Sequence, residues 1–248
     1  PELGMEENRT AKVVAAALSA IGLEVTTKVG KTGVVGLLRG NGSGRTLMLR
    51  ADMDALPIKE ENDVSYRSLH DGVMHACGHD GHMACLLTAA KILAGYNQDF
   101  PGQIKFVFQP GEEGFAGARQ MIEDGVLENP TVDAAIGLHV SMDVPSGFVE
   151  TRGGPMLASM DSFVFRIKGK GAHVAKPEEG IDAILMSTQI INTLQSLVTK
   201  EISPLTPLVM HVGTIKGGDA FNTIAEEIEL KGTVRTHDQS LRKSIPER

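Results

Sequence analysis

The stretch QIKFVFQPGEEG, residues 103–114, decides the fold class of this 248-residue chain. Its first part, Gln103–Phe108, is rich in β-branched and aromatic residues and predicts a strand. The apolar segment 83–95 before it and the segment 116–123 after it predict helices, and residues 133–139 predict a second strand. Strands that alternate with helices predict an α/β fold with a helix-covered, largely parallel sheet.

The N-terminal part of the chain adds one more helix and three more strands. Apolar residues at helical spacing predict a helix over residues 6–21, which Gly22 ends. Short β-branched runs then predict strands over residues 23–29, 34–38 and 46–50. Because Asn41-Gly42 lies between the last two runs, it predicts a hairpin that pairs them.

A second domain is expected after the breaker cluster Arg152–Pro155, which suits a hinge between residues 1–152 and 153–248. Beyond it the pattern predicts a strand, a helix, two strands and a helix that begins at Asp238. These elements cover residues 161–168, 181–199, 208–215, 226–236 and 238 onward. The order needs one more strand to complete a ferredoxin-like, split βαβ unit, so the sequence predicts an incomplete α+β satellite domain and a C-terminally truncated chain.

The composition of the chain argues against several kinds of binding partner. The formal net charge is -7 with no basic block, and aromatic residues make up 4% of the chain with no Trp, so nucleic acid and anionic membranes are not expected partners. No run approaches the roughly 18 apolar residues of a membrane span. Cys77 and Cys85 cannot form a disulfide framework, which favours a reducing cytoplasmic location.

The densest group of metal-binding residue types is HACGHDGH, residues 75–82, with three histidines, one cysteine and one aspartate. Thiolate and imidazole suit zinc and neighbouring transition metals. In an extended or turn segment Cys77 and His79 would point the same way, and glycines would let the backbone bend close to an ion. The alternative is a turn with exposed histidines and a buried cysteine. The number of donors favours the metal site.

Further donors follow predicted strands. Glu112 and Glu113 come just after QIKFVF, Asp52 and Asp54 follow another strand, and His139 ends a third. Adjacent carboxylates repel, so the glutamate pair suggests one metal ligand and one general base, although such pairs also occur on solvated loops. One aspartate could orient a ligand histidine. His139 taken alone is more typical of a core histidine, but ligand sites lie beyond the carboxyl ends of parallel strands, where all these residues converge.

Five motifs resemble one family in their residues and their order. LRADMDALPI, MHACGHDGH, FVFQPGEEG, GLHV and GGDAFN are similar to motifs of the aminoacylase/carboxypeptidase-type metal-dependent amidohydrolases. The branch that the chain resembles most is the N-acyl-amino-acid amidohydrolases, which includes hippurate and indole-acetyl-amino-acid hydrolases. The resemblance implies a hydrolase that releases a free amino acid and a carboxylic acid from a small N-acyl amino acid.

The resemblance also implies roles for single residues. It assigns Cys77, His79, Glu113 and His139 as ligands of two divalent ions, zinc or manganese. It assigns Glu112 as the general base and Asp54 as the carboxylate that orients the site.

In the second domain, the resemblance implies a homodimer formed through residues 153–248. His173 matches a histidine that reaches the partner subunit's active site and stabilises the oxyanion, although spacing alone favours a surface turn. Asn222 and Arg235 match residues that contact the substrate carbonyl or carboxylate, and an arginine fork suits a carboxylate. The family's last ligand histidine lies beyond the residues present here, so residues 1–248 alone are expected to be poorly stable, to bind metal incompletely and to turn over slowly.

Two other functions remain open at this point. A truncated relative could dimerise and hold a ligand without turning it over. Cys77 with His79 could instead act as a cysteine nucleophile, although a thiolate among other metal donors is usually occupied by metal.

Overall fold

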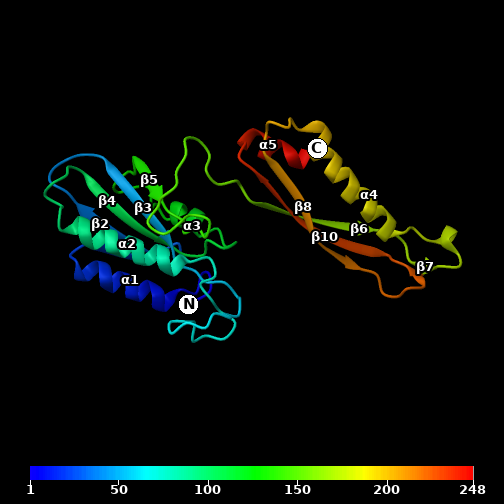
Figure 1. Ribbon diagram of the computed structural model, residues 1–248, viewed down its shortest axis with the longest axis horizontal. Helices are drawn as coiled ribbons and strands as arrows, with labels where there is room; N and C mark the ends of the chain where they lie inside the picture. The colour runs from blue at the N-terminus through cyan, green and yellow to red at the C-terminus, as the bar shows by residue number, and fades with distance from the viewer. Residues whose placement is uncertain (248) are drawn as a thin grey trace. The chain divides into compact units, whose positions relative to one another are not determined.

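The computed structural model describes residues 1–247, which form two compact units, Pro1–Pro145 and Ser146 onward (Figure 1). The division between the units lies before the predicted hinge at Arg152–Pro155, which falls inside the second unit. Among the described residues, no helix is both long and apolar enough to cross a bilayer.

The first unit contains a five-stranded mixed sheet, with strand order β1-β2-β4-β3-β5. The strands are β1 (Glu24–Val29), β2 (Gly33–Arg39), β3 (Thr46–Asp52), β4 (Gln103–Gln109) and β5 (Ala134–Gly137). β2 runs antiparallel to both β1 and β4, whereas β3 runs parallel to both β4 and β5. The α/β class is confirmed, but the expectation of a largely parallel sheet is wrong, because half of the sheet is antiparallel.

The hairpin predicted at Asn41-Gly42 is also wrong. β4 lies between β2 and β3, and the backbone of Gly40 and Asn41 donates hydrogen bonds to Gly102 and Phe100 instead. The hairpin of this sheet joins β1 to β2 across Gly30 and Lys31, both at positive φ. The physical reason is burial, since β4 is buried on both faces and takes the central position, which separates β2 from β3.

Helices cover both faces of this sheet. α1 (Asn8–Ala20) and α2 (His79–Ala94) lie side by side on one face (Figure 1). They pack against it with a stripe of apolar residues that includes Leu18 and Leu86, opposite Phe106 and Phe108 of β4. α3 (Gly117–Glu123) covers the other face, where Met121 contacts Val107. Alternate residues of β4 thus anchor both layers.

α2 begins four residues earlier than the sequence predicted, and this places part of the donor cluster on a helix. Gly78 precedes the helix in the left-handed conformation, with φ of 82°. A Cβ at Gly78 would lie 2.5 Å from Cγ2 of Val140, so this position needs glycine for its conformation and for space. His79 and His82 therefore occupy the first turn of α2, on neighbouring positions of one helix face.

The second unit has the predicted strand–helix–strand–strand–helix order. Its antiparallel sheet has the order β6-β10-β8, with β6 (Asp161–Lys168), β8 (Leu208–Gly217) and β10 (Glu227–Thr236). α4 (Ala183–Ser196), extended by a π-helical turn over Leu197–Glu201, connects β6 to β8. α5 (Gln239–Ser244) begins after Asp238, whose carboxylate accepts the backbone N–H groups of Ser240 and Leu241. Two short strands, β7 (Ala172–His173) and β9 (Thr223–Ile224), pair separately, and 3-10 turns cover Pro177–Glu179 and Ile245–Glu247.

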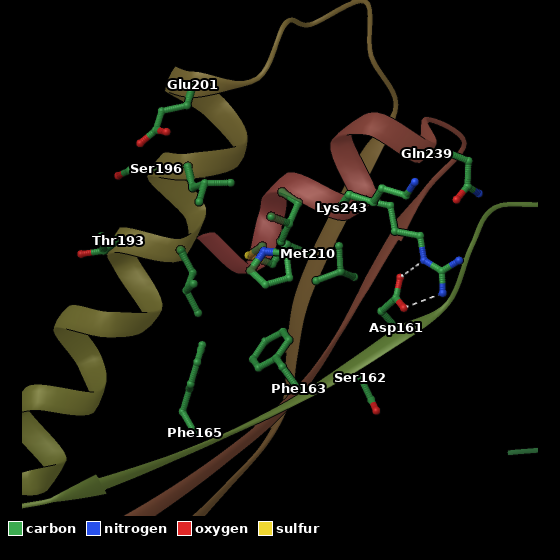
Figure 2. Close-up of a pocket in the computed structure, with 16 residues that line it drawn as sticks. Asp161, Ser162, Phe163, Phe165, Thr193, Ser196, Glu201, Met210, Gln239 and Lys243 are labelled. Atoms are coloured by element: carbon green, nitrogen blue, oxygen red, sulfur yellow. Dashed lines mark hydrogen bonds and ion pairs between the residues drawn. The ribbon is translucent and has the colours of Figure 1, made fainter. Parts of the chain in front are cut away.

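A cavity of about 920 Å³ lies in this second unit, between α4, the sheet and α5 (Figure 2). Phe163 and Phe165 of β6 line it together with Leu194 of α4, and Asp161 forms an ion pair with Arg242 at one end. None of the predicted site residues lines this cavity. The candidate metal site must therefore be sought elsewhere.

Candidate metal centre

The donors predicted from the sequence meet at one edge of the first unit's sheet. β3, β4 and β5 run parallel to one another, so their carboxyl ends lie at the same edge. Asp52 and Asp54 lie at and just beyond the end of β3, Glu112 and Glu113 follow β4, and His139 follows β5. Cys77 and His79 join them from the start of α2.

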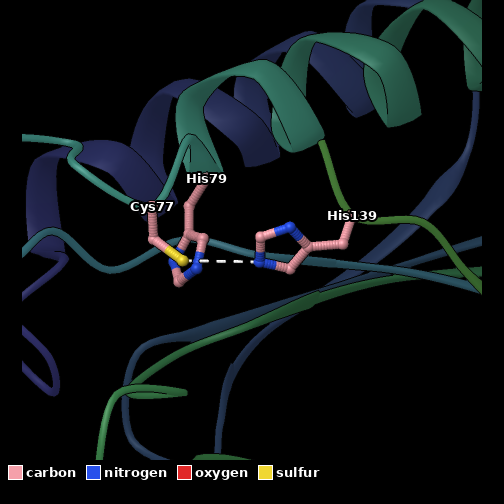
Figure 3. Close-up of side chains that lie close together, drawn as sticks. All are labelled: Cys77, His79 and His139. Atoms are coloured by element: carbon pink, nitrogen blue, oxygen red, sulfur yellow. Dashed lines mark hydrogen bonds between the residues drawn. The ribbon is translucent and has the colours of Figure 1, made fainter. Parts of the chain in front are cut away.

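The soft donors form one group. The donor atoms of Cys77, His79 and His139 all lie within 4.8 Å of one another (Figure 3). Sγ of Cys77 is 3.4 Å from Nε2 of His139. Nδ1 of His139 lies 2.7 Å from the carbonyl oxygen of Val140, which can only accept, so Nδ1 carries the proton and Nε2 keeps its lone pair toward Cys77.

The carboxylates form a second group that shares His79 with the first. The donor atoms of His79, Glu112 and Glu113 also lie within 4.8 Å of one another. Asp54 lies behind them, where its carboxylate accepts the backbone N–H of Glu112 at 3.0 Å and of Glu113 at 2.9 Å. Oδ1 of Asp54 is also 3.3 Å from Nδ1 of His79. Asp54 thus holds the segment Gly111–Glu113 after β4, which we call the glutamate loop, and also contacts the shared histidine, His79.

His79 itself shows that a cation fits this site. The side chain is 1% exposed, yet neither ring nitrogen has a hydrogen-bond partner of good geometry among the described residues. Nε2 lies 3.6 Å from Oδ2 of Asp52 and 4.0 Å from Oε1 of Glu113. A buried imidazole nitrogen without a partner is costly, and a divalent ion would satisfy Nε2 of His79 together with Glu113. Sulfur, nitrogen and oxygen donors together suit zinc and similar metals.

The electrostatics of the centre lead to the same conclusion. Partial burial of its carboxyl group, together with the charges of Glu113 and Asp52, raises the pKa of Glu112. Burial and the neighbouring carboxylates of Glu113, Glu112 and Asp52 raise the pKa of the Cys77 thiol to about 12. Arg50, which forms an ion pair with Asp52 at 2.8 Å, does not offset this negative charge. The centre therefore attracts a cation.

The raised pKa of Cys77 also bears on the cysteine-nucleophile alternative. A thiol with a pKa of about 12 has a thiolate fraction on the order of 10⁻⁵ at pH 7. Nucleophilic cysteines need the thiolate and are found in electropositive surroundings, whereas Cys77 faces carboxylates. A metal ion would lower this pKa by binding the sulfur.

Changing Cys77 to Ser should lower the amount of bound transition metal and shift the preference away from soft ions. The hydroxyl is a harder donor than a thiolate, so affinity for Zn²⁺ should fall more than affinity for Mn²⁺. Elemental analysis and competition titrations with both ions measure this. Cys85→Ser is the control, because Cys85 is exposed on α2 and belongs to no donor group among the described residues. Unchanged stoichiometry and affinity in Cys77→Ser would exclude Cys77 as a ligand.

Glu7 is a residue of this centre that the sequence did not reveal. Its side chain is fully buried, and its carboxylate accepts the backbone N–H of Gly111 at 2.8 Å and the hydroxyl of Thr32 at 2.5 Å. Glu7 and Asp54 together accept three successive backbone N–H groups, those of residues 111–113. In the sequence Glu6-Glu7 resembles a solvated pair at the start of the helix predicted over residues 6–21, and nothing in it distinguishes the buried member.

Changing Glu7 to Ala should lower the free energy of unfolding by about 2–4 kcal/mol, because two buried hydrogen-bond donors lose a charged acceptor. Urea denaturation measures this loss. The matched control is Glu6→Ala, which removes the same charge from an exposed neighbour and should change stability by less than about 0.5 kcal/mol. Equal effects of the two substitutions would contradict the positioning of the glutamate loop by Glu7.

In the second unit, the structure brings two of the three predicted site residues together. His173 pairs with Thr223 where β7 meets β9, and the N–H of Val174 donates to the carbonyl of Asn222 at 3.2 Å. Arg235 lies near the last residue of β10, at the far end of that strand from β9. Arg235 lies eight residues along β10 from Glu227, which is about 26 Å at roughly 3.3 Å per residue. One small substrate therefore cannot contact Arg235 and the His173–Asn222 pair of the same unit.

Comparisons with known proteins identify the family of this chain. The profile of peptidase family M20/M25/M40 matches residues 48–239. The thermostable carboxypeptidase 2 of Saccharolobus solfataricus is 44% identical over 98% of this chain and 62% of its own length. The N-acyl-L-amino acid amidohydrolase of Geobacillus stearothermophilus is 44% identical over 100% of this chain and 66% of its own length.

A solved structure is similar over the same extent. The crystal structure of a dinuclear metal-binding peptidase from Bacillus subtilis is 36% identical, with a TM-score of 0.82, over 100% of this chain and 63% of that one. The chain thus spans between 62% and 66% of the length of these three relatives. The profile match over most of the sequence and the identity of 44% over nearly its full length show that the chain belongs to peptidase family M20/M25/M40.

Proposed function

We propose that this protein hydrolyses the amide bond of small N-acyl amino acids with the help of two divalent metal ions, zinc or manganese. The observation that carries the proposal is the pair of donor groups that share the buried imidazole of His79, whose Nε2 has no hydrogen-bond partner among the described residues, at the carboxyl ends of three parallel strands. The relatives named amidohydrolase and carboxypeptidase, and the dinuclear site of the structural neighbour, support it.

In this proposal Cys77, His79, Glu113 and His139 hold the ions, and Asp54 orients the site. Asp54 is suited to this role because it contacts both His79 and the backbone of Glu113. Bound ions would polarise the amide carbonyl and make water more acidic.

Glu112 acts as the general base. It takes a proton from the attacking water as the water oxygen bonds to the carbonyl carbon. The C–N bond then breaks, and Glu112 passes the proton to the leaving amine nitrogen. The products are a free amino acid and a carboxylic acid, so that one water molecule is consumed for each bond cleaved.

The second unit would supply the remaining contacts with the substrate. We propose that the adjacent His173 and Asn222 bind the carbonyl oxygen as it becomes negative, that Arg235 binds a carboxylate, and that residues 153–248 form a homodimer. The separation of Arg235 from His173 within one unit supports a site that needs more than one copy of this unit. Sedimentation equilibrium tests the dimer. The free thiols of Cys77 and Cys85 support a reducing, cytoplasmic location.

The test is a hydrolysis panel of N-acetyl, N-benzoyl and N-indoleacetyl amino acids, with the metal content measured in the same samples. It is run on residues 1–248 and on any longer form that the gene encodes. We expect turnover that chelation removes and Zn²⁺ or Mn²⁺ restores. Metal binding without turnover in every form would favour a ligand-binding relative. Turnover that survives metal removal and disappears on alkylation of Cys77 would favour a cysteine nucleophile.

A further inference from the structure

We propose that His82 is a positioning residue that places the metal ligand His139 through the backbone of Val140. This inference rests on the proposed metal centre. It gives a role to the last histidine of HACGHDGH, which is not among the residues proposed above to hold a metal.

His82 has no free lone pair with which to bind a metal. It is fully buried, and Nδ1 lies 2.6 Å from Oδ1 of Asp52, while Nε2 lies 2.9 Å from the backbone nitrogen of Val140. The N–H of Val140 can only donate, so Nε2 accepts and the ring proton is on Nδ1, where it donates to Asp52. The donor atoms of Asp52, His79 and His82 do lie within 4.8 Å of one another, but both nitrogens of His82 are occupied.

Val140 transmits the position of His82 to His139. Its N–H donates to His82, and its carbonyl oxygen accepts the Nδ1 proton of His139 at 2.7 Å. This second bond turns the other nitrogen of His139 toward Sγ of Cys77, 3.4 Å away. A continuous path of hydrogen bonds therefore runs from Asp52 through His82 and Val140 to His139.

The segment that carries His139 depends on this contact. β5 ends at Gly137, and its pairing with β3 also stops there, so no strand pairing holds residues 138–140. Among the hydrogen bonds of the described residues, the bond from Val140 to His82 is the one that ties this segment to α2. The side chain of Val140 also lies against Gly78 at the start of α2. His139 itself is exposed, so its own burial does not fix it.

Two amide variants separate the two bonds of His82. In His82→Gln the side-chain amide reaches about as far as Nε2 and can still accept from Val140. In His82→Asn it reaches only as far as Nδ1, where it can donate to Asp52 but leaves Val140 without an acceptor.

The first measurement needs no metal. Amide hydrogen exchange of Val140, followed by NMR in the metal-free protein, should be about tenfold faster or more in His82→Asn and close to wild type in His82→Gln. His82→Leu, which removes both bonds, serves as a second disrupting variant if His82→Asn does not fold. Unchanged exchange of Val140 in the disrupting variants would overturn the inference.

The second measurement is a thermodynamic cycle on Zn²⁺ affinity. His82→Asn should weaken binding by about 10–100-fold, as is typical for residues behind a metal ligand, and His82→Gln by much less. In a His139→Ala background, His82→Asn should have almost no further effect, because the ligand that it positions is already gone. A full additional loss in that background would overturn the inference, since a purely structural role gives additive effects.

The cycle also separates this inference from the proposed function. If His139→Ala alone leaves Zn²⁺ affinity unchanged, His139 is not a ligand. In that case the proposed set of metal ligands is wrong, and so is the inference that His82 positions one of them. The exchange rate of Val140 then still decides whether His82 holds the segment.

Discussion

Replacing Glu112 by Gln should reduce the rate of amide hydrolysis by about 10²–10⁴-fold, the usual contribution of a general base, while the metal stays bound. Glutamine keeps the shape of the side chain and its backbone N–H bond to Asp54, but its amide cannot take a proton from water. Steady-state kinetics and elemental analysis of the same preparations measure the two effects.

The neighbouring residue provides the control for this prediction. Glu113→Gln should lower metal content, because Oε1 of Glu113 faces the unpartnered nitrogen of His79 at 4.0 Å. If Glu112→Gln lost the metal and Glu113→Gln kept it, the two roles would be reversed.

Replacing Asp54 by Asn should weaken metal binding by about 10–100-fold and lower turnover in proportion. The two oxygens of Asp54 accept the N–H groups of Glu112 and Glu113, and one of them also faces His79. An amide has one oxygen, so its NH₂ group would point at a donor, and the glutamate loop and His79 would shift apart. Competition titration with Zn²⁺ measures the change in affinity.

Asp133→Asn is the matched control. Asp133 accepts the backbone N–H of Thr46 at 2.7 Å, at the opposite end of β3 from Asp54. Its replacement should leave Zn²⁺ affinity within about twofold of the wild type, since it touches none of the donor groups. Equal losses in affinity for both variants would mean that Asp54 acts through general stability and does not orient the site.

The sequence alone predicted the longer helices and strands and most of the donors that meet at this edge of the sheet, because those signals are local. An apolar run followed by charged residues marks a strand and its end, as in Gln103–Gln109 followed by Glu112 and Glu113. Asp161–Lys168 is a strand with the predicted bounds, and Asp238 caps a helix as predicted. Since parallel strands present their carboxyl ends at one edge, the meeting of these donors could also be predicted.

The order of the strands in the first unit's sheet could not be predicted from such local signals. Asn41-Gly42 is a strong local signal for a hairpin, yet β4 lies between the two strands that this turn was expected to pair. The choice depends on which strand is covered by helices on both faces and so takes the central position. That is a comparison among segments distant in the sequence, and a turn dipeptide contains no information about it.

The contacts that distinguish His82 from His79, and Glu7 from Glu6, were decided by the tertiary structure. His79 and His82 are three positions apart, and Glu6 and Glu7 are neighbours. The sequence determined that these side chains are present, but residue type and spacing do not show which distant groups each of them contacts. His82 differs from His79 because it meets the N–H of Val140, 58 residues away. Glu7 differs from Glu6 because it meets the N–H of Gly111, 104 residues away. A buried side chain takes its function from the hydrogen-bonding groups around it, and the folded chain sets which groups those are.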